Sequence, residues 1–423
     1  MFYSVLTMKV YLEVYGCTAN KSDASLIKGL LIEDNNEIVK NIDDSNIIII
    51  LTCTVIGTTE QRMISRLKKF KEYGKKIIVT GCMASVQTDL IKKIYPEVLF
   101  LPPQFTPHIV DFIKSKKIPE IPRNKTNLSK SYDGITAPIS ISEGCMFSCS
   151  YCITSLARGK LRSFPIDEII KDARFAVRNG IKEIQLTAQD TSSYGFDSKK
   201  DLGELLRKIV EIEGEYRIRV GMMNPYTALK NLDSILLGFN NLKIYKFLHL
   251  PVQSGNNEIL EKMERKYSVK EFKEIVNIFR KKFPDITIST DVIVGFPDET
   301  DEQFNNTIEL LKNVKPDITN ITRFSARPYT KAKTMKGRLK TEIVKDRSKK
   351  LTVLCSDISK QNNLKYVGKT YNVLVTEIGK NNSYMGRSEN YKTVVIKDNV
   401  KIGEFKNVKI TKAEPVYLVG SLK

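Results

Sequence analysis

The chain has 423 residues, enough for about three domains and an ample hydrophobic core. Lysine and arginine total 68 against 48 aspartates and glutamates, and this net charge of +20 favours a polyanionic partner. Hydrophobic residues make up 41% of the chain, and no apolar run approaches the roughly 18 residues of a membrane span, which excludes a disordered tail protein and a membrane-spanning helix.

Cysteine usage indicates the compartment. Residues 1–16 lack the basic segment, apolar core and cleavage site of a signal peptide, so we expect a cytoplasmic protein without membrane attachment. Seven cysteines are an odd number in a large chain of this kind. Such a count disfavours a disulfide framework and favours reduced thiolates that bind metal.

Three β-rich segments in the first third of the chain each end at a cysteine. The cysteines are Cys17, Cys53 and Cys82, and the segments before them are residues 9–16, 46–52 and 75–81. Helix-like stretches follow the first two cysteines, and alternating strands and helices predict a parallel sheet with right-handed crossovers. Because the carboxyl ends of parallel strands meet at one edge, we expect the three thiols to converge.

A single cysteine at such a position is more often a small buried hydrophobic residue than a ligand. Recurrence at three equivalent positions favours one site with three thiolates. Thiolates suit an iron–sulfur cluster or zinc, and the spacing is too wide for a zinc finger. An iron–sulfur cluster held by three thiolates would have one iron open to another ligand.

The most specific signal in the chain follows a polar connection at residues 119–130. Cys145, Cys149 and Cys152 have Cys-x3-Cys-x2-Cys spacing after a strand-like run, with Tyr151 before the last cysteine. Zinc is disfavoured because no fourth cysteine or histidine follows at finger spacing. The loop resembles the radical S-adenosylmethionine (SAM) motif. This resemblance implies a [4Fe-4S] cluster whose fourth iron binds the amino and carboxylate groups of SAM and whose electron generates a 5′-deoxyadenosyl radical.

Six strand-like runs alternate with helical stretches from this point. They are residues 138–144, 183–190, 218–223, 247–252, 286–294 and 318–325. One helix is predicted over 165–180, with a proline at its start and a glycine at its end. Six βα units predict a partial (βα)6 TIM-like barrel, with its chemistry at the carboxyl ends of the strands.

Polar residues near these strand ends are candidates for cofactor binding. Each alone is more often a turn residue or helix cap, but together they outline a ring around the predicted cofactor. The candidates are Tyr151, Gln189, Asp190, Arg219 and Gln253, with Ser254, Gly255 and the Gly295-Phe296-Pro297 run nearby. His108 and His249 are lone histidines, and we predict structural roles for both.

A basic bridge follows the barrel. Residues 323–350 contain eleven lysines and arginines and two acids, a local charge of +9. Part of this segment is expected to be a solvated helix face, and the basic chain as a whole also favours a phosphate-facing track. Cys355 has no partner spacing and is predicted to be structural. The candidate RNA-binding residues are Arg158, Arg162, Arg327, Lys331, Lys333 and Arg338.

From residue 366 the pattern changes to short alternating strands with glycine, asparagine and lysine turns. It predicts a small all-β barrel of about 58 residues. Tyr371, Tyr384 and Tyr391 stand among lysines, which suits looped or single-stranded RNA through phosphate contacts and base stacking. We expect RNA, and not DNA, as the nucleic acid partner.

Over nearly its whole length the chain resembles the radical methylthiotransferases. Three dispersed N-terminal cysteines, the GCMFSCSYC loop, GFPDET and a C-terminal module like the TRAM domain carry this resemblance. The runs LTAQDTSSYG, GMMNP and FLHLPVQSGNNEILEKMERKY are most similar to the archaeal and eukaryotic branch, the threonylcarbamoyladenosine tRNA methylthiotransferases. The resemblance implies an N-terminal methylthiotransferase domain over 1–125, a radical SAM domain over 131–360 and a TRAM RNA-binding domain over 361–423.

The resemblance implies two [4Fe-4S] clusters, one on Cys17, Cys53 and Cys82 and the radical-generating one on the Cys145, Cys149 and Cys152 loop. It also implies SAM as cofactor, an electron-donor protein as partner, and the tRNA anticodon loop as substrate. There N6-threonylcarbamoyladenosine, just 3′ of the anticodon at position 37, gains a 2-methylthio group. No protein base removes that aryl hydrogen as a proton at neutral pH, so the reaction requires a radical.

Three alternatives stay open. The methylthiolated group could be isopentenyladenosine in tRNA or an aspartate of a ribosomal protein, and the alternative from another class is an RNA-binding iron–sulfur protein without catalysis. The threonylcarbamoyl group carries a carboxylate, which calls for an arginine or lysine in the pocket. The candidates for that contact are Arg158, Arg162, Arg219 and Arg327.

Overall fold

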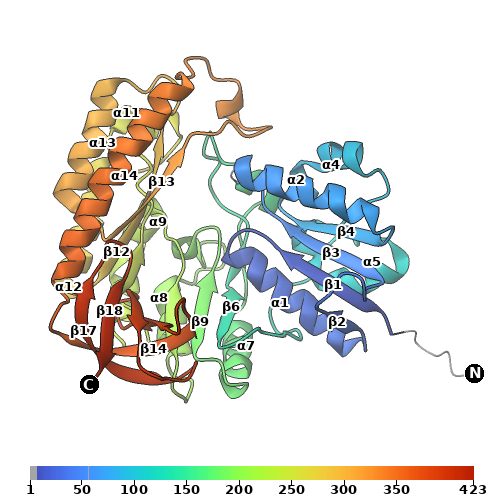
Figure 1. The fold of residues 1–423 in the computed structure, drawn as a ribbon. Helices are drawn as coiled ribbons and strands as arrows, with labels where there is room; N and C mark the ends of the chain where they lie inside the picture. The colour runs from blue at the N-terminus through green and yellow to red at the C-terminus, as the bar shows by residue number, and fades with distance from the viewer. Residues whose placement is uncertain (1–6, 56) are drawn as a thin grey trace, which may run out of the picture.

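The computed structural model describes residues 7–55 and 57–423, without the side chain of residue 58, and shows three parts in chain order (Figure 1). An N-terminal α/β domain lies beside a central parallel barrel, and a small β-barrel packs against the central one. Residues 1–6, part of the segment that lacks a signal-peptide pattern, lie outside the described residues. None of the described helices combines the length and hydropathy that a bilayer span requires.

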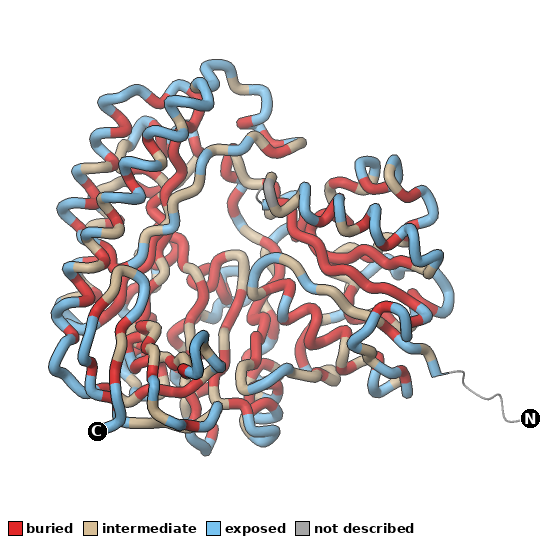
Figure 2. The backbone as a smooth tube through the Cα atoms, viewed as in Figure 1, coloured by how far each residue is buried: buried red, intermediate tan, exposed pale blue. Residues whose placement is uncertain are grey.

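The N-terminal domain is a parallel sheet in the order β2-β1-β3-β4-β5. Its strands are β1 (Lys9–Val14), β2 (Glu37–Val39), β3 (Ile47–Thr52), β4 (Lys76–Gly81) and β5 (Leu99–Phe100). Its helices are α1 (Thr18–Glu33), α2 (Gly57–Glu72), α3 (Met83–Val86), α4 (Thr88–Ile94), the 3-10 helix η1 (Pro103–His108) and α5 (Ile109–Ser115). Hydrophobic clusters with α1 and α5 on one face and α2 and α4 on the other bury β3 completely (Figure 2).

The central barrel contains the six parallel strands that the sequence predicts. They are β6 (Thr136–Ser140), β9 (Glu183–Thr187), β10 (Arg217–Val220), β11 (Phe247–His249), β12 (Thr287–Val294) and β13 (Ile318–Arg323). Two sheets, β10-β9-β6 and β11-β12-β13, are joined by a parallel bridge between Ile218 and Ile244. Among the described strands, β6 and β13 each pair with a single neighbour, so the barrel is open on one side. The prediction of a partial (βα)6 barrel is confirmed.

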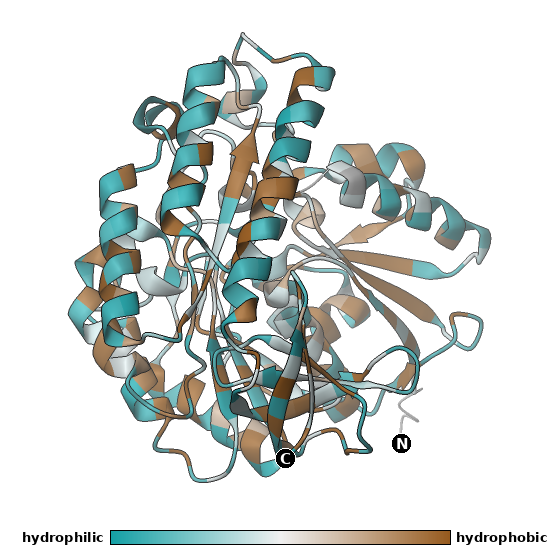
Figure 3. Ribbon diagram, turned by 60° about the vertical axis from the view of Figure 1, so that its left-hand side comes forward, coloured by the Kyte–Doolittle hydropathy of each residue, from teal (hydrophilic) through white to brown (hydrophobic). Residues whose placement is uncertain are grey.

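Helices cover the outside of this barrel. The short hairpin β7 (Ser142–Glu143) and β8 (Arg162–Ser163) flanks α6 (Thr154–Arg158). The remaining elements are α7 (Ile166–Arg178), η2 (Thr191–Ser193), α8 (Leu202–Ile209), α9 (Pro225–Lys230), α10 (Leu232–Phe239), α11 (Asn257–Lys262), α12 (Val269–Lys282), α13 (Asp301–Val314) and η3 (Lys331–Lys333). The outer helices carry both hydrophilic and hydrophobic bands (Figure 3). Capping boxes at Ser268 and Thr300 start α12 and α13.

The helix α14 (Thr341–Leu364) joins the barrel to the C-terminal module. It continues past residue 360, where the sequence predicts a domain boundary, because its last turns are buried. The hydroxyl of Ser359 donates to the carbonyl of Asp317 at 2.7 Å, and the amide of Asn363 donates to the carbonyl of Glu414 at 2.7 Å. Cys355 is buried in the barrel core, in agreement with its predicted structural role.

The C-terminal module is a closed five-stranded barrel in the order β14-β15-β16-β18-β17. Its strands are β14 (Thr370–Ile378), β15 (Tyr384–Ser388), β16 (Thr393–Ile396), β17 (Phe405–Ala413) and β18 (Leu418–Leu422). Tyr371 is buried in its core, so the prediction that this ring stacks on bases is wrong. Arg217 of the central barrel donates to the side-chain oxygen of Asn372 at 2.9 Å, and Lys392 pairs with Asp317 at 2.7 Å. The C-terminal module is therefore held against the central barrel by side-chain contacts as well as by the connecting helix.

Candidate active site

The six cysteines of the two predicted sites line a single cavity of about 430 Å³. Three of them follow β1, β3 and β4 of the N-terminal sheet, and the other three follow β6 and β7 of the barrel. Each set lies where its parallel strands end, so the carboxyl edges of the two sheets meet at the cavity.

Close approach of two loops explains a glycine beside the first cysteine. Gly16 has a φ of +98°, and a Cβ there would lie 2.8 Å from the Cβ of Cys53. The side-chain amide of Asn20 donates to the carbonyls of Tyr15 at 2.6 Å and Thr52 at 2.9 Å. Asn20 therefore fastens the loop after β1 to the end of β3, which holds the first two thiols near each other.

Two thiols of the N-terminal set, those of Cys53 and Cys82, lie in surroundings that disfavour a bare thiolate. Burial raises the pKa of Cys53 and raises that of Cys82 to about 11, and the neighbouring Cys17 thiol raises both further. The Arg158 guanidinium partly opposes these effects at Cys82. A metal centre bound here would have to displace protons, as is usual for thiolate ligands.

The second set of thiols lies on a tight loop at the head of the barrel. The amide of Cys152 donates to the carbonyl of Cys149 at 2.9 Å, and the amide of Phe147 donates to the Cys145 sulfur at 3.5 Å. Burial raises the pKa of Cys145 to about 12. Arg265 donates to the Cys149 sulfur at 3.4 Å, although burial still raises the pKa of that thiol.

Both sets fit iron–sulfur clusters better than single metal ions. Within residues 7–55 and 57–423, no three histidine, cysteine, aspartate or glutamate side chains are close enough to share one ion. In a cubane each thiolate binds a different iron, so the ligands stand farther apart than around one ion. All six cysteines are free thiols. The side-chain oxygen of Gln189 is buried at the cavity and accepts no hydrogen bond from the described residues, as expected for an atom that faces a ligand.

All five predicted cofactor-binding residues line this cavity, and four of them keep polar groups available to it. These four are Tyr151, Gln189, Arg219 and Gln253. Gln253 has a φ of +68°, a conformation that non-glycine residues rarely adopt outside functional sites. The strain places its side chain on the cavity wall.

Asp190, the fifth candidate, has a different role. Its carboxylate accepts four hydrogen bonds, from the amide and hydroxyl of Ser192, the amide of Asn224 and the hydroxyl of Thr227. Burial raises the pKa of this carboxyl. Asp190 therefore fixes the loops after β9 and β10, and its direct contact with the cofactor stays a prediction.

Comparison with known proteins agrees with this geometry. Residues 139–311 match the model of the Radical SAM superfamily, residues 9–101 that of the Uncharacterized protein family UPF0004, and residues 364–423 that of the TRAM domain. A protein of Archaeoglobus fulgidus named probable threonylcarbamoyladenosine tRNA methylthiotransferase is 43% identical over 98% of this chain and 99% of its own. The ribosomal protein uS12 methylthiotransferase RimO of Thermosipho melanesiensis is 34% identical over 98% of this chain and 99% of its own. The chain belongs to the radical SAM methylthiotransferases.

Solved structures support the fold of this methylthiotransferase. The radical S-adenosylmethionine methyltransferase TsrM of Kitasatospora setae, solved with tryptophan and a SAM analogue, aligns with a TM-score of 0.58 at 14% identity. The alignment covers 77% of this chain and 75% of that one.

Arg158 of the methylthiotransferase is buried at the domain junction, contrary to its predicted role in RNA binding. Its guanidinium donates to Asp23 at 2.9 Å, to Glu143 at 2.8 Å and to the side-chain oxygen of Asn20 at 2.6 Å. Lys125 pairs with the same two carboxylates, and the four charged side chains are at most 4% exposed. We name Asp23, Lys125, Glu143 and Arg158 the junction cluster, since it joins α1 to the barrel.

Two more of the predicted RNA-binding arginines are occupied by the protein itself. Arg327 is buried, pairs with Glu60 of α2 and donates to Thr54 at 3.3 Å, which closes the junction on its other side. Arg162 donates to the carbonyls of Pro122 and Arg123, at 3.0 and 3.3 Å. Burial and the ion pair with Glu60 remove Arg327 from the RNA-binding candidates, whereas Arg162 is half-buried and its RNA-binding role stays a prediction. The exposed candidates, which stay predictions, are Lys331, Lys333 and Arg338.

Three residues of the cavity wall carry no clear signal in a single sequence. His249, predicted to be structural, lines the cavity and shares a hydrogen bond of 3.1 Å with Asp291. Arg265, which contacts the Cys149 sulfur, follows α11 and not a strand. The sequence prediction considers residues directly after a strand. It therefore overlooks residues that face inward from within a strand, and residues on a loop that follows a helix.

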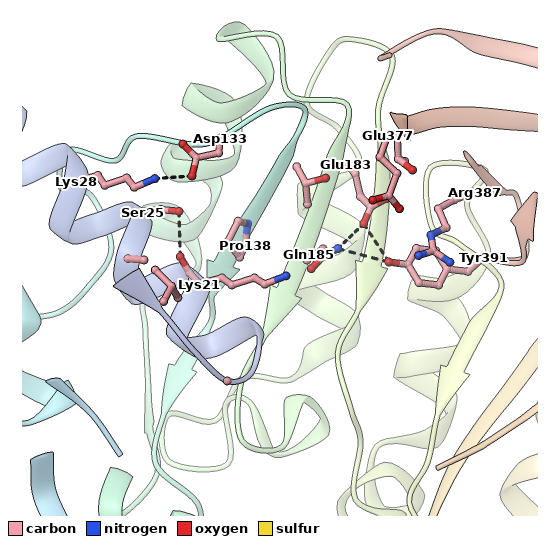
Figure 4. Close-up of a pocket in the computed structure, with 15 residues that line it drawn as sticks. Lys21, Ser25, Lys28, Asp133, Pro138, Glu183, Gln185, Glu377, Arg387 and Tyr391 are labelled. Carbon is pink, nitrogen blue, oxygen red and sulfur yellow. Dashed lines mark hydrogen bonds and ion pairs between the residues drawn. The ribbon is translucent and has the colours of Figure 1, made fainter. Parts of the chain in front are cut away.

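A second hollow of about 440 Å³ lies between α1, the β6–β9 edge and the C-terminal module (Figure 4). Lys21 points into it from α1, and Arg387 and Tyr391 reach it from the C-terminal module. The Tyr391 hydroxyl donates to Glu183 at 3.1 Å. This hollow therefore brings residues of all three parts of the methylthiotransferase together beside the open side of the barrel.

Proposed function

We propose that this methylthiotransferase acts on tRNA and converts N6-threonylcarbamoyladenosine at position 37, in the anticodon loop, to its 2-methylthio derivative. The observation that carries the proposal is the single cavity lined by both sets of cysteines. Archaeal relatives named for this activity are 38% to 43% identical over nearly the whole chain, against 34% for the ribosomal-protein enzyme. That difference favours tRNA over a ribosomal aspartate as substrate.

The residues that would hold the two [4Fe-4S] clusters are the six cysteines of the cavity. We assign Cys145, Cys149 and Cys152 to the cluster that works with SAM, and the N-terminal set to the second cluster. When bound, the clusters supply an electron for cleavage of the SAM sulfonium and an iron at which the transferred sulfur is held. Gln189 and Gln253 line the cavity, which supports the proposal that their side chains orient SAM.

The chain's own residues position these groups. Gly16 and Asn20 hold the loops of the N-terminal set together, and the hydrogen bond from Arg265 fixes the sulfur of Cys149. Asp190 rigidifies the two barrel loops beneath the cysteine loop. A site assembled on two rigid sheets keeps the reacting groups in a fixed relation, which is what proximity catalysis requires.

Binding of the anticodon loop is supported by the TRAM match, the net charge of +20 and the open side of the barrel. The hollow shown in Figure 4 offers Lys21 and Arg387 beside that opening, where RNA phosphates would pass. The free thiols support a reducing, cytoplasmic location, and cleavage of SAM requires an electron-donor protein as a further partner.

The test is anaerobic reconstitution of the full chain with iron and sulfide, followed by incubation with SAM, a reductant and tRNA that carries threonylcarbamoyladenosine. Mass spectrometry of the nucleosides should show conversion to the methylthio derivative. tRNA with isopentenyladenosine and ribosomal protein uS12 serve as competing substrates. Preferential modification of either competitor would overturn the substrate assignment, and absence of 5′-deoxyadenosine from every reaction would favour a non-catalytic RNA-binding protein.

A further inference from the structure

Three arginines and no lysine line the cavity that holds the six cysteines. Arg158 belongs to the junction cluster, and Arg265 donates to Tyr267 at 3.0 Å and to the Cys149 sulfur at 3.4 Å. Arg219 differs from both, because its guanidinium makes no hydrogen bond or ion pair with any of the residues that the structure describes. Among the arginines of this wall, Arg219 therefore keeps all of its N–H groups free of hydrogen bonds to the described residues.

Two aromatic rings hold the Arg219 guanidinium in place. Its central carbon lies 5.2 Å from the ring centre of Phe247 and 5.4 Å from that of Tyr391. Phe247 comes from β11 of the central barrel, and Tyr391 comes from the turn between β15 and β16 of the C-terminal module. Packing on ring faces leaves the N–H groups of a guanidinium free to bind a ligand in their plane.

The backbone conformation of Tyr391 is energetically unfavourable, so other contacts of this residue must stabilise it. Its φ is +63°, which is uncommon for a bulky residue, and its hydroxyl donates to Glu183 at 3.1 Å. In Figure 4 Tyr391 points toward Glu183 and Gln185 on the inner face of β9. The contacts to Glu183 and Arg219 offset the cost of this turn, so the C-terminal module supports the cavity arginine directly.

Nearby carboxylates have partners other than Arg219. Glu183 accepts hydrogen bonds from Gln185, Tyr245 and Tyr391. Asp291 accepts from Asn320 at 2.7 Å and shares a hydrogen bond with His249. A guanidinium that lines a cavity without a carboxylate partner is suited to an anionic ligand that enters it.

We propose that Arg219 binds the threonyl carboxylate of the substrate and so selects threonylcarbamoyladenosine over adenosines whose N6 group is neutral. The inference rests on the proposed function and adds the residue that sets its specificity. A guanidinium binds a carboxylate through two parallel hydrogen bonds, and an uncharged N6 group would bury the arginine without compensation. The other carboxylate that reaches this cavity is that of the methionyl part of SAM, and the experiment separates the two.

The experiment compares two anticodon stem-loop RNAs, one with threonylcarbamoyladenosine and one with its methyl ester, which removes the charge and adds one methyl group. Binding to the reconstituted full chain is measured by fluorescence anisotropy at fixed salt, and methylthiolation is measured by mass spectrometry. We expect the native chain to prefer the acid about tenfold to a hundredfold, the range for a hydrogen-bonded charge. Arg219→Gln should bind both RNAs alike, and Arg219→Lys should keep part of the preference.

Arg217→Gln is the matched control. Arg217 lies on the same strand, two positions earlier, but its guanidinium bonds to Asn372 outside the cavity. This variant should retain the native ratio of acid to ester binding. Formation of 5′-deoxyadenosine without RNA, and the affinity for SAM, are measured in Arg219→Gln and Arg217→Gln alike, so that a role of Arg219 in SAM binding is separated from a role in substrate binding.

An unchanged preference for the acid in Arg219→Gln would overturn the proposal. Loss of SAM affinity with the acid preference intact would also overturn it and assign Arg219 to the cofactor carboxylate. If the native chain binds both RNAs but methylthiolates neither, the proposed function fails, while the binding ratios still decide the role of Arg219. Arg219→Lys covers the case in which the glutamine variant does not fold.

Discussion

The junction cluster allows a quantitative prediction. It contains two cations and two carboxylates with side chains between 0% and 4% exposed, so it is neutral as a whole. Replacing Arg158 by methionine keeps the aliphatic bulk but leaves one uncompensated negative charge in the interior. Removing one member of a buried ion-pair network costs about 3 to 5 kcal/mol, a large part of the stability of a typical domain.

Charge balance, rather than the loss of particular contacts, should dominate this cost. Glu143→Gln alone leaves an excess positive charge, and we expect about 3 kcal/mol of destabilisation from it. The double variant Arg158→Met/Glu143→Gln retains one lysine and one aspartate and is neutral again. It should therefore be more stable than the sum of the single changes predicts, by about 2 kcal/mol of coupling free energy.

The assay is urea unfolding of the iron-free, reduced protein, followed by circular dichroism at pH 7. Unfolding of several domains need not be two-state, so the first transition is compared between variants. Lys312→Met is the control, because Lys312 pairs with Glu309 at a surface where both side chains are more than half exposed, and it should cost no more than about 0.5 kcal/mol. Strict additivity of the two single changes would refute the charge-balance reasoning.

Three further results are expected. Burial opposes ionisation of Glu143, but Lys125 and Arg158 outweigh burial and lower the pKa of Glu143 from 4.5 to about 2. The stability that this carboxylate contributes is therefore complete above pH 4.5 and is lost as the pH falls toward 2. Acid unfolding of the native chain measures this loss. Cys53→Ala should lower the iron content from about eight to about four per chain and abolish methylthiolation while 5′-deoxyadenosine still forms. Loss of both activities with the cluster on Cys145, Cys149 and Cys152 intact would show that the roles are divided wrongly. Lys21→Glu should weaken tRNA binding and reduce the slope of log affinity against log salt concentration by about one. An affinity equal to that of the native chain at every salt concentration would show that α1 does not contact the RNA.

Much of the fold could be predicted from local patterns. The three N-terminal strands before cysteines and the six barrel strands overlap strand-like runs of six to nine residues, and all appear as parallel strands. The short strands β2, β5 and β8 were not predicted, because two or three residues carry no measurable period and pair only through tertiary contacts. The last turns of α14, which extend past the predicted domain boundary at residue 360, are stabilised by partners far along the chain.

The cysteines of the site were predictable because each follows a strand, and topology alone sends strand ends to a common edge. The arginines were not. Arg158 meets Asp23 across 135 residues of sequence and Arg327 meets Glu60 across 267. A single sequence does not indicate whether a basic residue faces a phosphate or a buried carboxylate. Only the fold distinguishes the arginines of the domain junction from Arg219.

The docking of the C-terminal module bears on how substrate binding and selection are connected. A module that only raised affinity for RNA could be joined by a flexible linker, since phosphate contacts need no fixed relation to the cavity. Here the rigid helix α14 leads into the module, and the turn that carries Tyr391 enters the barrel and packs on Arg219. Because the ring that supports the cavity arginine belongs to the RNA-binding module, a shift of that module on the RNA would move the residue against which the modified base is read. The same contact thus gives the module a part in selecting the substrate as well as in holding it.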